Sequence, residues 1–429
     1  MANSLAIRFK TEGQTNNTVI EDVLRGRPGW MPVGSDDTNW DIFWCDLATT
    51  KLILESSMKN HQKIAHYRNF YEISRKNYLA RNLKRYRRQC VKNGNTEEAE
   101  LSNAMPMTFE IPSETALFLQ EARRDSHNMW IVKPSGGSQG RGILLFKKLS
   151  EFEEWRENKD WSPKERKRSD DPNDIELIPE VYVAQKYITN PYLLEGRKFD
   201  MRMYVLVTSF SPLTVWIARD GFARIAGIKY CKDNFADNCM HLTNTAIQLS
   251  GENLSQGRKW DIQNLRLFLT AMHGREIVDE LFQKIAKVVI TALKSVECIM
   301  MGNKHCFELF GFDILLQDNL NVCLLEANAA PSMKATDDHD YKLKYNLIQD
   351  ALNVIDLEKK LTGKEIRVGG FDKIWCGGPI YQINKGMNAP EFCKKSNFYN
   401  MYLGCVNDRD EQLEEMTKWM NILKKETVI

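Results

Sequence analysis

Two apolar segments joined by a short polar link constrain the fold more than any other part of the chain. They are residues 306–316 and 322–328, and both contain mainly aliphatic and aromatic side chains. The link, residues 317–321, reads Gln-Asp-Asn-Leu-Asn and is rich in residues that favour turns. The pattern therefore predicts a β-hairpin of two apolar strands.

Three oxygen-bearing side chains are expected on one face of this hairpin. If Gln317 and Val322 close a four-residue loop, Asp313 lies directly opposite Glu326. Asn328 follows Glu326 by two residues, so its side chain points to the same face. Unpaired carboxylates are costly in apolar surroundings, and Mg²⁺ binds one or two carboxylates while keeping positions for phosphate and water. The hairpin therefore predicts a Mg²⁺ site that carries substrate phosphates; the alternative is the polar outer face of a surface hairpin.

Size and composition limit the class of protein. The 429 residues are enough for two or three domains, and the net charge of +2 does not indicate any partner. No apolar run approaches the roughly 20 residues of a membrane span, residues 1–6 do not resemble a secretory signal, and Ala2 replaces the glycine needed for N-myristoylation. The ten cysteines include no C-x-x-C pair, which fits a reducing compartment. We expect an intracellular protein without a membrane partner.

A glycine-rich loop lies between two predicted strands, at residues 130–133 and 143–146. Residues 133–142 read Lys-Pro-Ser-Gly-Gly-Ser-Gln-Gly-Arg-Gly, which is neither a Walker A loop nor a G-x-G-x-x-G motif. Glycines let backbone N–H groups approach phosphate oxygens. The loop predicts a lid over nucleotide phosphates with Lys133 as its cationic anchor; an ordinary loose turn is the alternative.

Residues 198–204 alternate between polar and apolar side chains. Lys198, Asp200, Arg202 and Tyr204 share one face of the predicted strand. The apolar run that follows favours a central strand, so the charged face would line a cleft in which Arg202 neutralises phosphoryl charge. The alternative is a solvated edge with weak surface ion pairs.

The remaining pattern alternates strands and helices. Trp40, Phe43 and Trp44 have helical spacing and are expected in the core, and the charged residues 157–176 are expected to form a mobile surface loop. Further elements are predicted as strands at 181–188, 199–209 and 213–219, and as helices at 74–90, within 261–300, near 340–353 and at 409–425.

Taken together, five motifs in this order resemble the tubulin–tyrosine ligase-like family, and most closely its short glutamylase branch found with cilia and flagella. The motifs are Lys133-Pro…Gly140-Arg-Gly-Ile143, Gly196-Arg-Lys-Phe-Asp-Met-Arg202, His241-Leu-Thr-Asn244, Phe307-Glu-Leu-Phe-Gly-Phe-Asp313 and Leu325-Glu-Ala-Asn-Ala-Ala-Pro-Ser332. The resemblance implies an α+β (α/β) ATP-grasp fold. It also implies an N-terminal domain at 1–105, a central subdomain at 106–190, a C-terminal subdomain with the metal site at 191–358 and a loosely structured tail at 359–429.

The resemblance further implies roles for individual residues. ATP would contact Lys133, Gln139, Gly140, Gln185, Lys186, Tyr187, Ile188, Lys198, Asp200, Thr243 and Asn244. Mg²⁺ would be held by Asp313, Glu326 and Asn328. The substrates would contact Gln139, Arg224 and Lys259, and the catalytic cations would be Lys198 and Arg202. Ala327 and Ala330 depart from the pattern of the family, which usually has Val and Ser there.

The implied reaction uses ATP and Mg²⁺ to add free L-glutamate to glutamate side chains in tubulin tails through an acyl phosphate. Its partners would be tubulin or microtubules and other subunits of a glutamylase complex, in the cytoplasm and cytoskeleton of a cilium or flagellum. One alternative is an inactive family member that serves as a tubulin-binding subunit. A nucleic-acid binder is a weaker alternative, because it leaves the hairpin unexplained.

Two surfaces could recruit an acidic partner. The first is the basic face of helix 74–90, formed by Arg75, Lys76, Arg81, Lys84, Arg85, Arg87 and Arg88. It is a candidate for docking acidic tubulin tails, or it is simply a solvated helix face. The second is the apolar stripe of the terminal helix, formed by Leu413, Met416, Met420 and Leu423, which packs either on a partner or on its own domain.

Overall fold

The computed structural model describes most of the chain. The described residues are 6–12, 18–125, 127–137, 140–162, 164–167, 175–178, 180–232, 234, 238–244, 247–248, 258–382 and 397–414. Within them, no helix is both long enough and apolar enough to cross a membrane.

A large mixed sheet of twelve strands forms the centre of the molecule. Its long antiparallel strands are β13 (Leu213–Ile225), β12 (Arg197–Phe210), β15 (Cys306–Leu316) and β16 (Val322–Asn328). Parallel pairing of β15 with β4 extends the sheet through β4 (Lys63–Ala65), β3 (Ile42–Trp44), β1 (Ile7–Thr11) and β2 (Trp30–Pro32). The other members are β11 (Leu193–Leu194), β14 (Arg258–Asp261), β17 (Arg367–Val368) and β18 (Phe371–Cys376). The N-terminal strands thus share one sheet with β12 and β15, while the expected domain boundaries stay a prediction.

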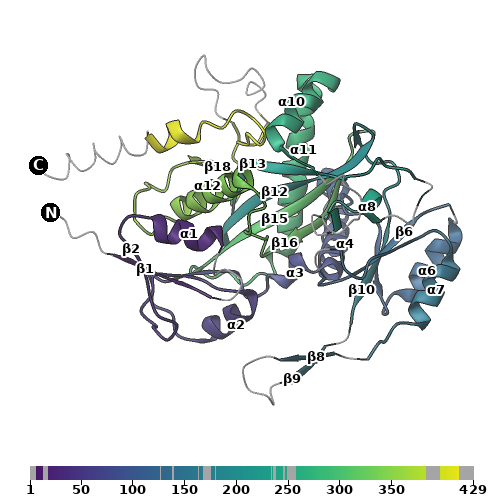
Figure 1. Ribbon diagram of the computed structural model, residues 1–429, viewed down its shortest axis with the longest axis horizontal. Coiled ribbons are helices and arrows are strands. Elements are labelled where there is room, and N and C mark those ends of the chain that lie inside the picture. The colour runs from purple at the N-terminus through teal and green to yellow at the C-terminus, as the bar shows by residue number, and fades with distance from the viewer. Residues whose placement is uncertain are drawn as a thin grey trace, which may run out of the picture.

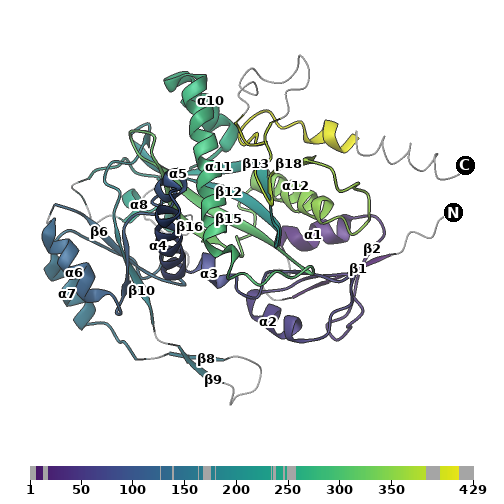
Figure 2. The ribbon, with the colours of Figure 1, turned by 180° about the vertical axis from the view of Figure 1, so that it is seen from behind.

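Helices cover both faces of this sheet (Figures 1 and 2). One face carries α1 (Val19–Gly26) and α12 (Asp338–Ile355), and the other carries α4 (Lys76–Lys92), α10 (Ile262–His273) and α11 (Arg275–Glu297). The alternation along β12 explains this arrangement, because Met201 and Met203 join the core on the α11 side whereas Tyr204 and Leu206 join the core on the α12 side. The predicted helices within 261–300 and near 340–353 are confirmed. Shorter helices are α2 (Leu47–Glu55), α3 (Tyr71–Ser74), α5 (Thr96–Leu101) and α8 (Asn238–His241).

A second, four-stranded antiparallel sheet forms a smaller lobe at the end of the molecule away from both termini (Figure 1). Its order is β5 (Thr108–Ile111), β10 (Tyr182–Lys186), β6 (Trp130–Pro134) and β7 (Leu144–Phe146). The helices α6 (Thr115–Arg124) and α7 (Leu149–Glu157) cover one face, where Phe118, Phe146 and Phe152 pack against Trp130 and Tyr182. β6 and β7 flank the glycine-rich loop as predicted, and they pair with each other.

The hairpin β15–β16 confirms the predicted pairing of Asp313 with Glu326, although the predicted turn is one residue too short. Leu316, rather than Gln317, pairs with Val322, so the loop has five residues. A register shift between Asp313 and Ile314 then restores the expected pairing at the polar end of the hairpin. The bulge therefore brings the two carboxylates together.

Two other predictions are wrong in their secondary structure. Trp40, Phe43 and Trp44 are buried as predicted, but Ile42–Trp44 is the strand β3, because its pairing with β1 and β4 overrides the helical spacing. Residues 157–176 are not one irregular loop. They include β8 (Lys164–Lys167), which pairs with β9 (Ile175–Ile178).

The described part of the C-terminal tail is attached to the core by buried ion pairs. Arg219, with its side chain fully buried on β13, binds Asp372 of β18 at 2.7 Å and also Asp408. Arg409 binds Asp350 of α12 at 2.6 Å. The described residues of the predicted terminal helix are 409–414; Met416, Met420 and Leu423 lie outside them.

Candidate active site

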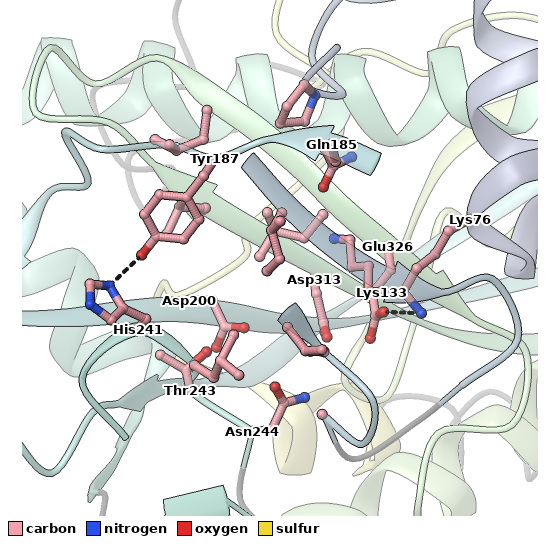
Figure 3. Close-up of a pocket in the computed structure, with 18 of the residues that line it drawn as sticks. Lys76, Lys133, Gln185, Tyr187, Asp200, His241, Thr243, Asn244, Asp313 and Glu326 are labelled. Carbon is pink, nitrogen blue, oxygen red and sulfur yellow. Dashed lines mark hydrogen bonds and ion pairs between the residues drawn. The ribbon is translucent and has the colours of Figure 1, made fainter. Parts of the chain in front are cut away.

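A cleft between the small lobe and the central strands collects most of the predicted site residues (Figure 3). Those that line it are Lys133, Gly140, Gln185, Lys186, Tyr187, Ile188, Lys198, Asp200, Arg224, Thr243, Asn244, Asp313 and Glu326. Gln139 lies outside the described residues. Among the described residues, the lining carries six cationic side chains against three carboxylates. This excess of positive charge favours a ligand with several negative charges.

One end of the cleft is apolar. Ile131 and Ile143 from the small lobe pack with Leu242 and Tyr187 in a separate cluster of buried side chains. The backbone N–H groups of Lys186 and Tyr187 already donate to the carbonyl oxygens of Met107 and Met129, at 2.8 and 2.9 Å. These two N–H groups of the predicted adenine hinge are therefore already bonded within the protein. The apolar side chains at this end of the cleft are the groups available to contact an aromatic base.

The described residues of the glycine-rich loop, 133–137 and 140–142, contribute to the lining of the cleft. Gly140 has a φ of +72°, and a Cβ atom there would lie 2.2 Å from Ile247 Cδ1, so only glycine fits the position. Lys76 Nζ donates to the Gly137 carbonyl oxygen at 3.1 Å and the Lys76 N–H donates to the Ser135 carbonyl oxygen. The loop is thus held against α4 on one side and residue 247 on the other.

Two lysines in the cleft have a lowered pKa and lose their protons more readily than exposed lysines do. Burial lowers the pKa of Lys198 to about 7, and burial together with the neighbouring Lys76 lowers the pKa of Lys133 to about 8. Both side chains would regain full charge beside an anion. Lysines of this kind suit a phosphate site, because the ligand replaces the solvation that burial removed.

Interlocked ion pairs lie at the opposite end of the cleft; Asp200, Arg224 and Asp313 line it, whereas Arg202 is not a lining residue. Arg202 from β12 binds Asp313 through two nitrogens, one of them at 2.9 Å from Oδ2. Arg224 from β13 binds Asp200 at 2.7 Å and Asp313 at 2.7 Å. Burial raises the pKa of Asp313, while Arg202 and Arg224 act in the opposite direction. The charged side chains of this face of β12 therefore lie inside the protein, where Asp200 and Arg202 form ion pairs with Arg224 and Asp313 of the neighbouring strands.

Glu326 has a different cationic partner. Lys76 Nζ lies 3.0 Å from Glu326 Oε2 (Figure 3). Asn328 Nδ2 donates to Glu326 Oε1 at 3.1 Å. Burial opposes ionisation of Glu326, but Lys76 and Lys133 outweigh it and lower the pKa of this carboxyl well below its usual range. Asp313 and Glu326 face each other as ionisable oxygen ligands with an amide beside them, which is a donor set that fits Mg²⁺.

The third predicted substrate residue, Lys259, faces away from the cleft lining towards α12. Its Nζ lies 3.0 Å from Asp340 Oδ2, and Lys344 Nζ lies 2.9 Å from the same oxygen. Asp340 is buried, and Lys259 also donates to Thr336 Oγ1. Lys259 and Lys344 therefore form a second pair of cations behind Arg202, held by one carboxylate.

Sequence reasoning missed several contributors. Lys76 was assigned to an exposed basic face, but it is buried and belongs to the site. His241 was singled out only as part of a motif, yet its ring binds the Tyr187 hydroxyl at 2.9 Å. Asp340 and Lys344 are not among the residues predicted for the site. A buried position for Lys76 could have been suspected from its neighbours Asn77, Leu79 and Ala80, which are buried on the same helix.

The two sheets that enclose a cation-rich cleft, with a glycine loop on one side and paired carboxylates on the other, are those of the ATP-grasp class. Residues 54–362 match the model of the "Tubulin-tyrosine ligase family". The chain is 41% identical over 440 residues to a rat protein named "Probable tubulin polyglutamylase TTLL9", covering 98% of this chain and 94% of the relative.

Two more distant relatives agree. A Caenorhabditis elegans protein named "Probable tubulin polyglutamylase ttll-9" is 39% identical over 357 residues, 82% of each chain. A Tetrahymena thermophila protein named "Probable alpha-tubulin polyglutamylase Ttll1" is 34% identical over 398 residues, 87% of this chain and 93% of the relative. The chain therefore belongs to the tubulin–tyrosine ligase family and is a ligase, so the family predicted from the motifs is confirmed.

Proposed function

We propose that the protein is an ATP- and Mg²⁺-dependent ligase that adds free L-glutamate to glutamate side chains in the C-terminal tails of tubulin. The observation that carries the proposal is the cleft itself, where cations from four elements surround the opposed carboxylates Asp313 and Glu326. The names of the relatives support tubulin as the acceptor. A role on the cytoskeleton of cilia or flagella is part of the same proposal.

The chemistry requires activation of the acceptor. A carboxylate is a poor acyl donor, because oxide would have to leave. Transfer of the γ-phosphoryl group of ATP to an oxygen of the acceptor's side-chain carboxylate forms an acyl phosphate and releases ADP. The α-amine of free glutamate then attacks the carbonyl carbon, the C–O bond to phosphate breaks, and the amine loses a proton as the isopeptide bond forms. Bringing these anions together makes charge neutralisation and positioning the main tasks of the protein.

Each predicted residue has a place in this scheme. The apolar end, with Gln185, Lys186, Tyr187 and Ile188, receives the base, and Thr243 and Asn244 lie beside the nucleotide. Lys133, Lys198 and the loop with Gln139 and Gly140 bind its phosphates, with Asp200 contributing to the nucleotide site. Asp313, Glu326 and Asn328 would hold Mg²⁺, which supplies Lewis-acid neutralisation of phosphate charge when bound.

The arginines and Lys259 would exchange partners when substrates bind. Arg202 would face the transferred phosphoryl group and Arg224 would receive a carboxylate of the incoming glutamate, whereas Lys259 would have to leave Asp340 and turn towards the cleft to contact glutamate. In the structure the same cations are paired with Asp313, Asp200 and Asp340. Substrate carboxylates and phosphates replace these partners without leaving a cation unpaired. The departures Ala327 and Ala330 are compatible with this scheme, because neither residue supplies a ligand.

The exposed part of α4 is the proposed docking surface for the acidic tail. Arg81, Lys84 and Arg88 line a groove next to Ser113 and Glu114, and Arg85 and Arg87 are exposed beside it. We expect Arg87→Ala with Arg88→Ala to raise the KM for microtubules, more at low salt than at high salt, and to leave the KM for ATP unchanged. A KM for microtubules that stays the same would contradict docking on α4.

The direct test is incorporation of labelled glutamate into microtubules by the purified protein with ATP and Mg²⁺. We expect glutamate rather than tyrosine or glycine to be incorporated, and removal of either ATP or Mg²⁺ to abolish it. A matching reaction with a ciliary extract supplies any further subunits. Absence of incorporation in both reactions would contradict the proposal.

A further inference from the structure

A closed network of hydrogen bonds surrounds the Tyr187 hydroxyl at the apolar end of the cleft. Lys198 Nζ donates to Tyr187 Oη at 2.9 Å and to the backbone carbonyl oxygen of His241 at 2.8 Å. Tyr187 Oη lies 2.9 Å from His241 Nδ1, as the dashed line in Figure 3 marks. The network therefore runs from Lys198 through Tyr187 to the His241 ring and returns to Lys198 through the His241 carbonyl.

The other nitrogen of His241 settles the direction of these bonds. His241 Nε2 lies 2.6 Å from the carbonyl oxygen of Asn234, which can only accept a hydrogen bond. Nε2 therefore carries a hydrogen, and in the tautomer that has no hydrogen on Nδ1 this nitrogen accepts from the Tyr187 hydroxyl. Tyr187 in turn accepts from Lys198. Tyr230 packs against the His241 ring, donates its hydroxyl hydrogen to the Thr189 carbonyl oxygen at 3.0 Å and also forms a side-chain hydrogen bond with Tyr187.

His241 thus joins parts of the protein that belong to different layers. Tyr187 follows β10 of the small lobe, Lys198 lies on β12 of the large sheet, and His241 ends α8. His241 borders the cleft but is only 1% exposed, and both of its ring nitrogens are bonded to protein groups, so its ring is held as an internal support. Lys198 Nζ lies 4.4 Å from the centre of the Tyr187 ring, so the same tyrosine both receives a hydrogen bond from the ammonium group and limits where it can go.

We propose that His241 is a positioning residue of the nucleotide site, which fixes the Tyr187 ring in the wall of the base pocket and aims Lys198 into the cleft. The inference deepens the proposed function, on which it rests for the identity of the nucleotide. Because His241 acts through Tyr187 and Lys198, its loss affects nucleotide binding, whereas the sites for glutamate and for the acceptor lie at the other end of the cleft.

The test measures nucleotide affinity directly. Calorimetric titration with a non-hydrolysable ATP analogue and Mg²⁺ is carried out on the full chain and on His241→Ala, His241→Asn, Tyr187→Phe and the double variant His241→Ala/Tyr187→Phe. We expect His241→Ala to weaken binding about tenfold and His241→Asn to recover most of this loss, because the asparagine oxygen accepts from Tyr187 near the position of Nδ1. The double variant is expected to bind no more weakly than the weaker single variant.

Several outcomes would overturn the inference. They are unchanged affinity in His241→Ala, no recovery in His241→Asn, and losses that add in the double variant. If His241→Ala does not fold, the affinities of His241→Asn and Tyr187→Phe for the ATP analogue are compared instead. Tyr187→Phe should bind the analogue clearly more weakly than His241→Asn does, and equal affinities would contradict the inference. In an active protein, the KM for ATP should rise while the KM for glutamate stays constant. A protein that binds the analogue as expected but adds no glutamate contradicts the proposed function and leaves this inference intact.

Discussion

The two ends of the cleft are built on opposite physical principles. At the base end, apolar side chains such as Ile131 and Leu242 pack with a neutral hydrogen-bonded group, Tyr187 with His241. At the metal end, Asp313 and Glu326 are held by Arg202, Arg224 and Lys76 in buried ion pairs. The base end is complete before a ligand arrives, whereas the metal end holds its charges in pairs that ligands must replace.

This difference teaches where mutations should act. Removing an apolar side chain from the wall of the base end should weaken nucleotide binding in proportion to the apolar contact area lost. Removing one member of a buried ion pair should affect chemistry and stability together, since the remaining charge is left without compensation. The predictions below test this contrast.

The largest effect is expected from Glu326→Gln at the metal end. Loss of the carboxylate removes a proposed metal ligand and the partner of Lys76, so kcat for glutamate addition should fall by about 100- to 1,000-fold. The free energy of unfolding should also fall, by about 1–3 kcal/mol, because Lys76 stays buried without its anion. Glutamate incorporation and thermal unfolding measure the two effects.

The matched control is Glu55→Gln, which removes a carboxylate 3.1 Å from Arg68 in a more exposed pair that borders neither the cleft nor the groove on α4. It should change activity by less than about twofold. If both variants behaved alike, Glu326 would be an ordinary surface carboxylate.

Gly311→Ala should displace Arg202 without changing any charge. A Cβ atom at position 311 would lie 3.1 Å from Arg202 Cδ and 3.0 Å from Pro331 Cβ, so these neighbours must shift by a few tenths of an ångström, and we expect the flexible arginine to be displaced. We expect kcat to fall by about 10- to 100-fold, with a loss of stability of about 1 kcal/mol. Steady-state kinetics measure the first; Gly378→Ala, where the new Cβ would meet nothing within 4 Å, is the control. Equal kinetics in the two variants would show that the position of Arg202 does not matter.

The third prediction concerns pH. In the protein without nucleotide, the pKa of Lys198 is about 7, so this side chain loses its charge as the pH rises above 7. Bound phosphates would raise the pKa of Lys198 again. Nucleotide binding should therefore take up a proton and weaken by up to about tenfold per pH unit between pH 7 and 9. Calorimetry in two buffers of different ionisation enthalpy measures the proton uptake.

Lys198→Arg is the control for this pH dependence, because arginine keeps its charge throughout the range. It should retain only the weaker dependence that comes from Lys133, whose pKa is about 8. A wild-type affinity that is constant from pH 7 to 9 would contradict the assignment of Lys198 to the phosphates.

The smallest effect is expected at the base end. Ile131→Ala removes part of the apolar wall, so nucleotide affinity should fall by about 3- to 10-fold while kcat stays constant. The control is Leu117→Ala on α6 of the same lobe, where the leucine is 55% exposed and away from the cleft. A change in kcat as large as that in Gly311→Ala would remove the distinction between the two ends.

Local patterns in the sequence predicted the strands of the site well, because alternation and turn residues act over a few positions. The hairpin shows both the strength and the weakness of such reasoning. The turn was predicted one residue too short, and the pairing of Asp313 with Glu326 was still right because a bulge compensates. Neither the bulge nor its compensation follows from the pattern of apolar residues.

Contacts between distant segments could not be predicted in the same way. Lys76 and Glu326 are 250 positions apart in the sequence. The pattern of a basic helix predicts its polar face, but it does not predict which residues of that face are covered by another element. The same holds for Lys259, whose partner Asp340 lies on α12. The sequence predicts this helix but not its contacts with the rest of the protein. The nucleotide, metal and substrate roles of the site residues stay predictions, and the variants above are chosen to test them.

The most direct test of the central claim follows the oxygen atoms of the acceptor. A tubulin-tail peptide with ¹⁸O in its side-chain carboxylates is incubated with the protein, ATP, Mg²⁺ and glutamate, and the inorganic phosphate is analysed by mass spectrometry. Activation through an acyl phosphate predicts one ¹⁸O atom in phosphate for each isopeptide bond formed. Isopeptide bonds formed with unlabelled phosphate would contradict the account.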